Sequence, residues 1–278
     1  MTTPPELQVD AGPTRLRTIF ARALREERGA LIGWTIGIVA FCLVMLAMYP
    51  TVHGNAGFSK LLDAYPEALR KLFQLQDYTT GAGYLRTEVF SFVAPLLLTL
   101  FAVLWGSDLT AGEEERRTID LLLANPISRR RFVSEKWLAL VVGTIVIAAA
   151  LEGALGALGP LFKLHVAWSA LTAAVLGSWL FAVAFGTFAL ALGATTGRRG
   201  IARGVTTTIA LASYLLATFS QLVSWLRPVR NLSLWQHTLG VDPLGTGFHW
   251  WRLGLVVAVT LVFGAFALWS FDRRDLAT

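Results

Sequence analysis

Six long apolar stretches limit what this chain can fold into. The hydrocarbon core of a bilayer is about 30 Å thick, and a helix needs about 20 largely apolar residues to cross it. Every backbone polar group in lipid must be paired, which within a single apolar stretch means a helix. The sequence therefore predicts an all-α membrane protein with six transmembrane helices, at residues 30–49, 89–106, 137–159, 168–194, 205–225 and 253–271.

Composition agrees with a membrane protein and leaves no room for a large soluble domain. Apolar residues make up 55% of the 278 residues, charged residues make up 15%, and the mean hydropathy is +0.58. The segments between the apolar stretches are too short to bury cores of their own. We expect two parts: a tail with an amphipathic helix over residues 1–28, and a six-helix domain over residues 29–278.

The distribution of basic residues predicts the orientation. With the N-terminus placed inside, sixteen Lys and Arg residues fall in the inner segments and eight in the outer ones. This bias fits the positive-inside rule with both termini in the cytoplasm. The net charge of +6 is therefore explained by topology and by anionic lipid, and we expect no nucleic acid partner.

A short amphipathic helix is expected before the first span, over residues 14–28, with Thr14 as its N-cap. Leu16, Ile19, Phe20 and Leu24 recur at spacings of three and four, while arginines occupy the other faces. Such a helix lies in the membrane interface. The alternative is a plain cluster of charges that sets topology.

The outer segments are expected to lie at the membrane surface. The sequence predicts two short amphipathic helices in residues 50–88, separated at Pro66. Tryptophans near the outer ends of the spans form an aromatic belt, at Trp168, Trp225, Trp250 and Trp251. His237 and His249 lack the spacing of a metal site, so we expect no metal.

The segment between the second and third spans carries a dense set of charges. We expect Glu113, Glu114 and Glu115 to open a short helix, where the helix dipole favours negative charge. Ile119, Leu122 and Leu123 then share one face of that helix and form an apolar ridge in water. Pro126 stops the helix, and Ser128 caps the next one. An exposed apolar ridge indicates a docking surface for a partner.

This segment resembles the cytoplasmic loop of type-2 ABC exporter permeases, in which a pattern like E-E-x-G-T-L-[ED]-L-L-L-A-x-P-V-S-R leads into a helix with a lysine. Arg117 stands where that family usually has glycine. The resemblance extends over the whole chain through the number of helices, the entry helix and the length. The matching residues are Glu114, Glu115, Thr118, Ile119, Asp120, Leu121, Leu122, Leu123, Ala124, Pro126, Ile127, Ser128, Arg129 and Lys136.

The resemblance implies a membrane subunit that exports an amphiphilic substrate such as a drug, an antibiotic or a lipid. It implies a homodimer, or a heterodimer with a related permease, in a bacterial plasma membrane. Two P-loop ATPase subunits would bind ATP and Mg²⁺, so this chain would have no catalytic site or cofactor of its own. The helix that seats in the ATPase, called the coupling helix, would use Glu113, Glu114, Glu115, Thr118, Ile119, Asp120, Leu122, Leu123, Pro126 and Arg129.

Two observations bear on rival classes. The pattern G-x-x-x-x-G-K-[ST] does not occur, so an ATPase would have to be a separate polypeptide. Motifs of membrane enzymes such as H-E-x-x-H and G-x-S-x-G do not occur either. A non-transporting membrane anchor remains an alternative, as does a secondary transporter with a docking helix for a cytoplasmic partner.

Two acidic residues are candidates for the substrate path, because ionisable groups in spans are costly and often functional. Glu152 lies within the third span, and Glu88 begins the second span at its outer surface. For Glu88 the alternative is a solvated helix end. For Glu152 the alternative is helix packing next to Gly153 and Gly156.

Overall fold

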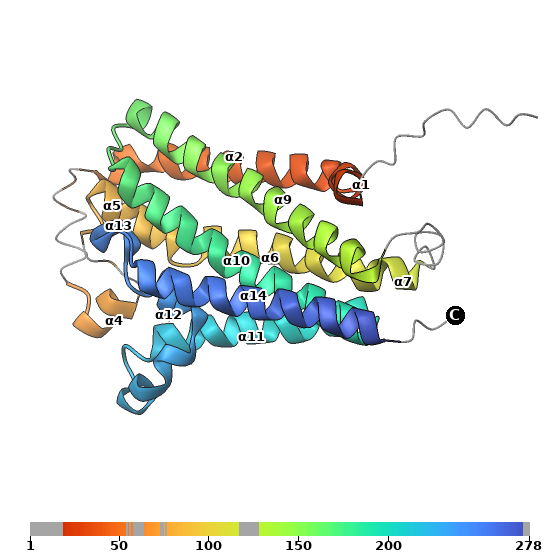
Figure 1. The fold of residues 1–278 in the computed structure, drawn as a ribbon. Coiled ribbons are helices and arrows are strands. Elements are labelled where there is room, and N and C mark those ends of the chain that lie inside the picture. The colour runs from red at the N-terminus through yellow and green to blue at the C-terminus, as the bar shows by residue number, and fades with distance from the viewer. Residues whose placement is uncertain are drawn as a thin grey trace, which may run out of the picture.

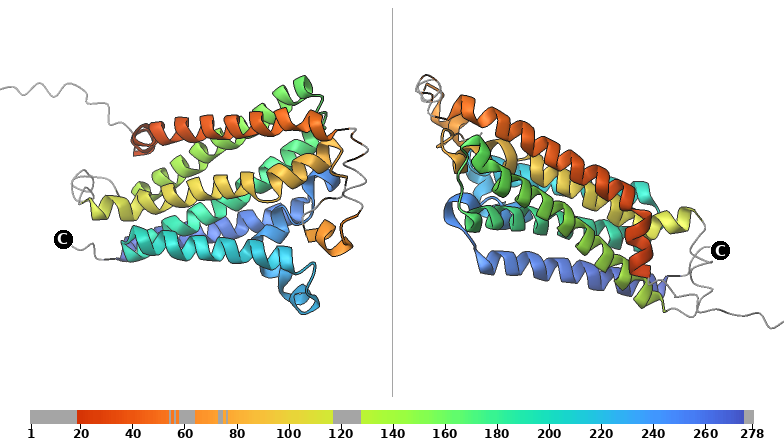
Figure 2. Two further views of the ribbon diagram at one scale, coloured as in Figure 1. Left: turned by 180° about the vertical axis from the view of Figure 1, so that it is seen from behind. Right: turned by 90° about the horizontal axis from the view of Figure 1, so that it is seen from above.

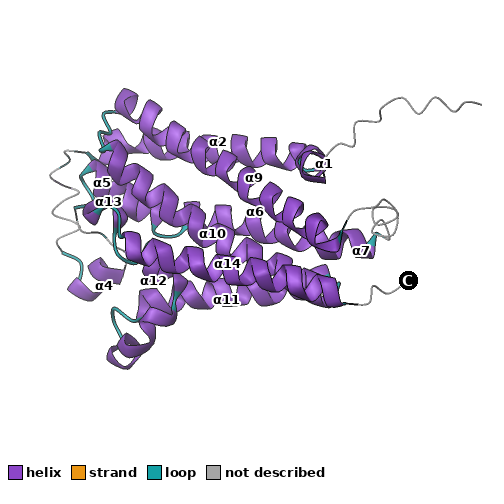
Figure 3. Ribbon diagram, in the orientation of Figure 1, coloured by secondary structure: helices purple, strands orange, loops and turns teal. Residues whose placement is uncertain are grey.

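In the computed structural model the described residues are 19–53, 55, 57, 64–72, 75, 77–116 and 128–274. Every regular element among them is helical (Figure 3). Six helical runs in this part of the chain are long and apolar enough to cross a membrane. The prediction of an all-α protein with six spans is therefore confirmed; the spans are Arg28–Val52, Gly81–Glu115, Arg129–Phe162, Trp168–Thr196, Arg199–Phe219 and Trp250–Arg273.

The spans run side by side in one bundle, and their ends form two distinct faces (Figure 1). One face carries α1 (Ile19–Glu26) and α7 (Glu113–Glu115), together with the ends of α10 (Trp168–Thr196) and α14 (Trp250–Arg273). We call it the charged end. At the opposite end lie the short helices α5 (Gly81–Leu85), α12 (Leu234–Thr238) and α13 (Pro243–Thr246).

The second span is longer than predicted and is the least regular. It joins α5 to a π-helical segment η1 (Arg86–Phe90), then α6 (Val93–Ser107), a second π-helical segment η2 (Asp108–Gly112) and α7. A prediction from hydrophobicity places the ends of this span at residues 89 and 106, because it assigns the charged residues beyond these points to loops. In the folded chain those charges find partners elsewhere, among them Asp242 for Arg86, Arg199 for Asp108 and Lys136 for Glu113, and the helical run continues past them.

Two other spans begin well before their predicted starts, at residue 129 against 137 and at residue 199 against 205. α9 (Arg129–Leu158) starts ahead of residue 137, and the Ser128 side chain accepts a hydrogen bond from Arg131 N, 3.3 Å away, as its predicted N-cap. α11 (Arg199–Phe219) is shifted towards the N-terminus relative to residues 205–225. Both differences have one cause: the first turn of each helix is rich in arginine, which hydropathy assigns to a loop.

The predicted short elements are described only in part. α1 turns into α2 (Arg28–Val52) at Glu27, whereas residues 14–18 of the predicted interfacial helix lie outside the described residues. In the long loop, α4 (Glu67–Leu72) begins directly after Pro66. The first helix predicted in that loop falls on residues 58–63, which also lie outside the described part of the chain.

The core of the bundle is the contact between α6 and α10, where glycines let two backbones meet. A Cβ added to Gly106 would overlap the carbonyl oxygen of Gly186, and one added to Gly186 would lie 2.9 Å from the Cβ of Ala102. Further along the contact, a Cβ on Gly193 would lie 2.6 Å from Thr110 Oγ1. Small residues at such seams allow close van der Waals packing where the hydrophobic effect between helices is absent.

The spans differ in how deeply they are buried. α10 is enclosed on nearly all sides, whereas α2 and α11 expose most of their side chains. Beyond α11, the 3₁₀-helical segment η4 (Ser224–Leu232) projects to the side of the bundle, next to α12 (Figure 2). The exposed apolar side chains on α2 and α11 fit a lipid environment or a second protein, since they have no partner within the described chain.

Replacing Gly106 by alanine should destabilise the bundle. Overpacking a tight core costs about 1–3 kcal/mol, and here the neighbour is backbone that cannot turn aside. The matched control is Gly33→Ala on α2, where nothing lies within 4 Å of an added Cβ. The control should be neutral, or stabilising by about 0.5–1 kcal/mol, because a helical glycine is replaced. Thermal unfolding in detergent measures both variants, and equal midpoints would contradict the close α6–α10 contact.

Candidate functional site

The three consecutive carboxylates Glu113, Glu114 and Glu115 lie at the C-terminal end of the second span. The prediction that they open a separate helix is wrong, because the helical run continues through η2 into α7. The C-terminal end of a helix carries partial negative charge, so carboxylates there are unfavourable unless cations meet them. Each of the three has a cationic partner from a different part of the chain.

Glu113 forms a buried ion pair with Lys136 of α9. Lys136 Nζ lies 2.7 Å from Glu113 Oε1, and the two side chains are 5% and 7% exposed. The ammonium group also lies over the Phe132 ring, 4.7 Å from its centroid. A buried pair of this kind holds two helices in register, because removing either partner leaves an uncompensated charge out of water.

Glu114 is held by Arg274, the residue directly after α14. The guanidinium group makes two hydrogen bonds to the carboxylate, of 2.6 and 3.0 Å, and a third of 3.2 Å to the carbonyl oxygen of Ala194. Gly197 permits this contact: its φ is +64°, and a Cβ there would lie 2.6 Å from Glu114 Oε2. A bidentate arginine–carboxylate pair combines strength with a defined geometry, so α14 and α10 are tied to α7.

Glu115 caps α11. One carboxylate oxygen accepts from the backbone N–H of Arg199 at 2.9 Å, and the other accepts from Arg199 Nε at 2.5 Å. A carboxylate at a helix N-terminus satisfies an unpaired N–H and interacts favourably with the dipole. The second span thus provides the cap for the fifth.

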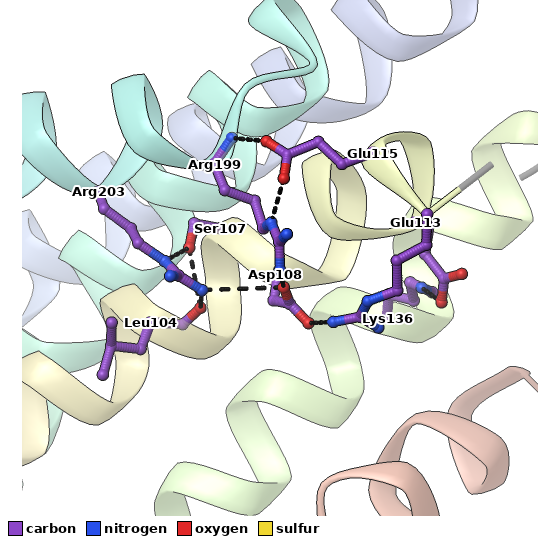
Figure 4. A network of polar contacts seen from close by, with 9 residues as sticks. Leu104, Ser107, Asp108, Glu113, Glu115, Lys136, Arg199 and Arg203 are labelled. Carbon is purple, nitrogen blue, oxygen red and sulfur yellow. Dashed lines mark hydrogen bonds and ion pairs between the residues drawn. The ribbon is translucent and has the colours of Figure 1, made fainter. Parts of the chain in front are cut away.

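Asp108 joins the arginines of this end into one network (Figure 4). It accepts from Arg199 Nη1 at 2.9 Å and from Arg116 Nη2 at 2.5 Å, and Arg203 Nη2 lies 3.8 Å away. Arg203 also donates from Nε to Ser107 Oγ at 2.9 Å. Asp108 lies in the π-helical segment η2, which packs on α10 while the carboxylate contacts Arg199 of α11.

The helix α1 docks on the same end. The backbone N–H of Phe20 donates to Glu135 Oε2 of α9, 3.1 Å away. A cavity of about 370 Å³ separates α1 from the cluster and is lined by Glu26, Glu27 and Trp105 among others. Burial raises the pKa of Glu27, and the nearby carboxylate of Asp108 raises it further. The carboxyl group of Glu27 is therefore easier to protonate than an exposed glutamate.

The described part of the chain brings together four of the ten residues predicted for docking: Glu113, Glu114, Glu115 and Arg129. Arg129 donates from Nη1 to the carbonyl oxygen of Arg274, 2.7 Å away. The other six lie outside the described residues, within 117–127: Thr118, Ile119, Asp120, Leu122, Leu123 and Pro126. The described carboxylates contact cations of this chain, so their contacts hold the second span to other parts of the bundle.

Sequence reasoning missed Asp108, Arg203 and Arg274 as members of this network. It counted the two arginines only as residues that set the topology, and it did not consider Asp108. A signal was present for two of them. Asp108 lies two residues after the second apolar stretch, and Arg203 lies two residues before the fifth. Charged residues at that depth need partners, because solvation there is incomplete.

The two candidates for the substrate path lie near the opposite end and are also partnered. Glu88 lies within the second span and not at its start, and it accepts a 2.5 Å hydrogen bond from the hydroxyl group of Tyr78. Burial and the contact with Glu88 raise the pKa of Tyr78 well above its usual range. Glu152 on α9 is half-buried and accepts a hydrogen bond from Thr172 Oγ1 on α10.

Comparison with known families gives one result that covers nearly the whole chain. The family described as "ABC-2 family transporter protein" matches residues 17–276. No curated protein matches the chain.

Replacing Lys136 by methionine should destabilise the protein by roughly 3–5 kcal/mol, because Glu113 is then left buried and unpaired. Adding Glu113→Leu to that variant should restore much of the loss, since an apolar pair of similar size removes the stranded charge. Chemical unfolding in detergent measures both. The control is Arg130→Gln: this side chain is 73% exposed, and losing its pair with Asp272 should cost less than about 1 kcal/mol. Equal losses in the single and double variants would mean that the pair does not act as a unit.

Proposed function

From the premise that this chain belongs to the ABC-2 transporter family, we propose that it is the permease subunit of an exporter driven by ATP. The family is one of multi-pass membrane proteins that serve as transport components of ABC systems, and it implies an ATPase partner. We place the charged end on the cytoplasmic side of a bacterial plasma membrane, with both termini inside. The excess of arginine at this end supports that orientation.

The observation that carries the proposal concerns the residues on either side of 117–127, which are bound to the charged end. Arg116, on one side of this segment, is tied to Asp108; Arg129, on the other side, is tied to Arg274. Through these contacts the segment is linked to the ends of α7, α9, α11 and α14. A force applied to the segment by a partner would therefore reach several spans at once, as coupling of ATP hydrolysis to transport requires.

This arrangement divides the predicted docking residues into two roles. Glu113, Glu114, Glu115 and Arg129 hold the charged end together through internal contacts. The apolar ridge of Ile119, Leu122 and Leu123, together with Thr118, Asp120 and Pro126, would contact the ATPase. ATP and Mg²⁺ would be bound by that partner, because no P-loop occurs in this chain.

We further propose that the working unit contains two copies of this chain, or one copy and a related permease, with two ATPase subunits. α11 supports this proposal, because it is the least hydrophobic span and yet exposes most of its surface. Small residues at a spacing of four line its exposed side, at Gly200, Gly204, Thr208 and Ala212. Such a stripe suits close contact with another helix better than contact with lipid.

The cargo we propose is an amphiphilic molecule such as a drug, an antibiotic or a lipid, so that multidrug efflux and antibiotic resistance are the expected roles. Glu152 and Glu88 are the candidates for contact with a positively charged cargo. Their hydrogen bonds to Thr172 and Tyr78 leave each carboxylate with further acceptor capacity.

Replacing Leu122 and Leu123 by aspartate should abolish binding of the ATPase and leave the bundle folded, because the change removes the proposed ridge. The measurement is co-purification of a P-loop ATPase in mild detergent, together with Mg-ATP hydrolysis and the mass of the complex. Charge reversal at Glu114 and Glu115 is a poorer test, since it breaks the contacts to Arg274 and Arg199.

The matched control is Leu161→Asp at the opposite end, where the side chain is 76% exposed; it should retain the ATPase. Purification of the unmodified chain without any ATPase would overturn the proposal and favour a secondary transporter. An ATPase that binds through the ridge but drives no export would favour a membrane anchor. The mass of the complex decides between one and two copies of the permease.

Replacing Glu152 by glutamine tests the substrate path. Glutamine keeps an oxygen that accepts from Thr172, so packing is preserved while the charge is lost. We expect weaker export of cationic amphiphiles, with neutral amphiphiles of matched hydrophobicity unaffected. Thr172→Val is the companion variant, since it removes the hydrogen bond and keeps the charge. An equal effect of Glu152→Gln on both kinds of cargo would assign Glu152 to helix packing.

A further inference from the structure

The segment η4 is an unusual element for the rim of a membrane bundle. It is a 3₁₀ helix of nine residues, whereas such helices rarely exceed three or four. None of its residues is buried. It projects sideways from the bundle at the opposite end (Figures 1 and 2).

The 3₁₀ period of three residues sorts the side chains of η4 into rows. Leu226, Val229 and Leu232 share one row, which we call the apolar row; Val229 is 39% and Leu232 is 79% exposed. Arg227 and Arg230 share the neighbouring row, which we call the arginine row. The sequence thus gives η4 one apolar and one cationic face, and all five side chains are exposed except Leu226, which is half-buried.

The arginine row has no anionic partner in the described part of the chain. No ion pair is formed by either arginine there, and residues 153–241 contain no Asp or Glu at all. The next carboxylate along the chain, Asp242, is 2.7 Å from Arg86 and is already paired. Two exposed guanidinium groups on an amphipathic element are complementary to phosphate groups.

The depth of η4 follows from the length of α11. Its 21 residues rise roughly 30 Å, which equals the thickness of the hydrocarbon core. Phe219, at the end of α11, therefore lies near the boundary of the hydrocarbon, and η4 begins a few residues later. Trp225, Trp250 and Trp251 are exposed at the same end, by 74%, 69% and 64%, as expected for an aromatic belt.

Hydrogen bonds hold η4 in this position. Ser233 Oγ, directly after η4, donates to the carbonyl oxygen of Ser213 on α11 at 2.6 Å. His237 Nε2 donates to the carbonyl oxygen of Asn231 at 2.8 Å, since a carbonyl can only accept. The His237 ring packs against Trp251. The exposed rows are thus part of a fixed structure.

We propose that η4 is a lipid-binding element, in which the arginine row binds phosphate headgroups of anionic phospholipids and the apolar row enters the acyl layer. An amphipathic element with arginines on one face and apolar residues on another lies in the membrane interface, and anionic lipid strengthens its binding. The partner is the leaflet at the opposite end of the bundle. This inference does not depend on the proposed function or on which side of the membrane that end faces.

Spin labels on η4 test the proposal in the full chain, reconstituted in phosphatidylcholine vesicles with and without phosphatidylglycerol. Cys42 is the single cysteine and is buried, so Cys42→Ala gives a background for labelling at Val229→Cys and Leu232→Cys. Asn231→Cys is the matched control, one residue from Leu232, on the third row, which also carries Trp225 and Pro228. Collision of each label with oxygen, which partitions into lipid, and with a water-soluble nickel chelate reports its surroundings.

We expect the labels at 229 and 232 to meet oxygen more than nickel, and the label at 231 to show the reverse. Phosphatidylglycerol should increase the preference for oxygen at 232, and Arg227→Gln with Arg230→Gln should remove that increase. Lys163→Gln, which changes another exposed cation at the same end, should leave it intact.

Three results would overturn the proposal. Access of the nickel chelate at 229 and 232 would place the apolar row in water. Shielding from both reagents would mean that protein covers the row, and coupling between labels would then identify a second copy of this chain. If phosphatidylglycerol still increased the preference for oxygen at 232 in the double arginine variant, the arginine row would not be the site that binds the headgroup.

Discussion

Carboxylates at the C-terminal end of a helix require cations, and that requirement organises the charged end of this protein. Glu113, Glu114 and Glu115 meet Lys136, Arg274 and Arg199 respectively, each from a different part of the chain. The helix dipole makes these carboxylates unfavourable on their own. The ends of α9, α11 and α14 must therefore stay close to α7, and the packing of the bundle at this end follows from charge as much as from apolar contact.

The span that carries the carboxylates is also the one that packs most tightly on the core helix. The overlap that any side chain at Gly106 would cause with α10 shows how closely the backbones approach. Gly112 has a similar role within η2, where a Cβ would overlap the carboxylate of Asp108. The charged network and the glycine contact are thus parts of one unit, and a shift of α7 would be felt by α10.

Sequence reasoning predicted the helices well and their ends poorly, for one physical reason. Apolar length identifies spans, but it treats every charge as a loop residue, so the predicted ends fall short of Glu115, Arg129 and Arg199. Local chemistry did better: the cap at Ser128 depends only on neighbouring residues and is confirmed. The pairing of Glu113 with Lys136 could not be predicted, because it depends on how distant helices pack.

α11 connects the two ends of the molecule in a way that its sequence already reflects. At the charged end its position depends on Arg199 and Arg203, and at the opposite end on the hydrogen bonds between Ser213 and Ser233. Between them most of its surface is exposed, so polar contacts at its ends do more to place it than packing along its length. A change in the Glu115 contact would therefore act on α11 before it acted on the enclosed α10. A helix can move as a rigid rod when ion pairs hold its end and packing along its sides is weak. α11 has both properties.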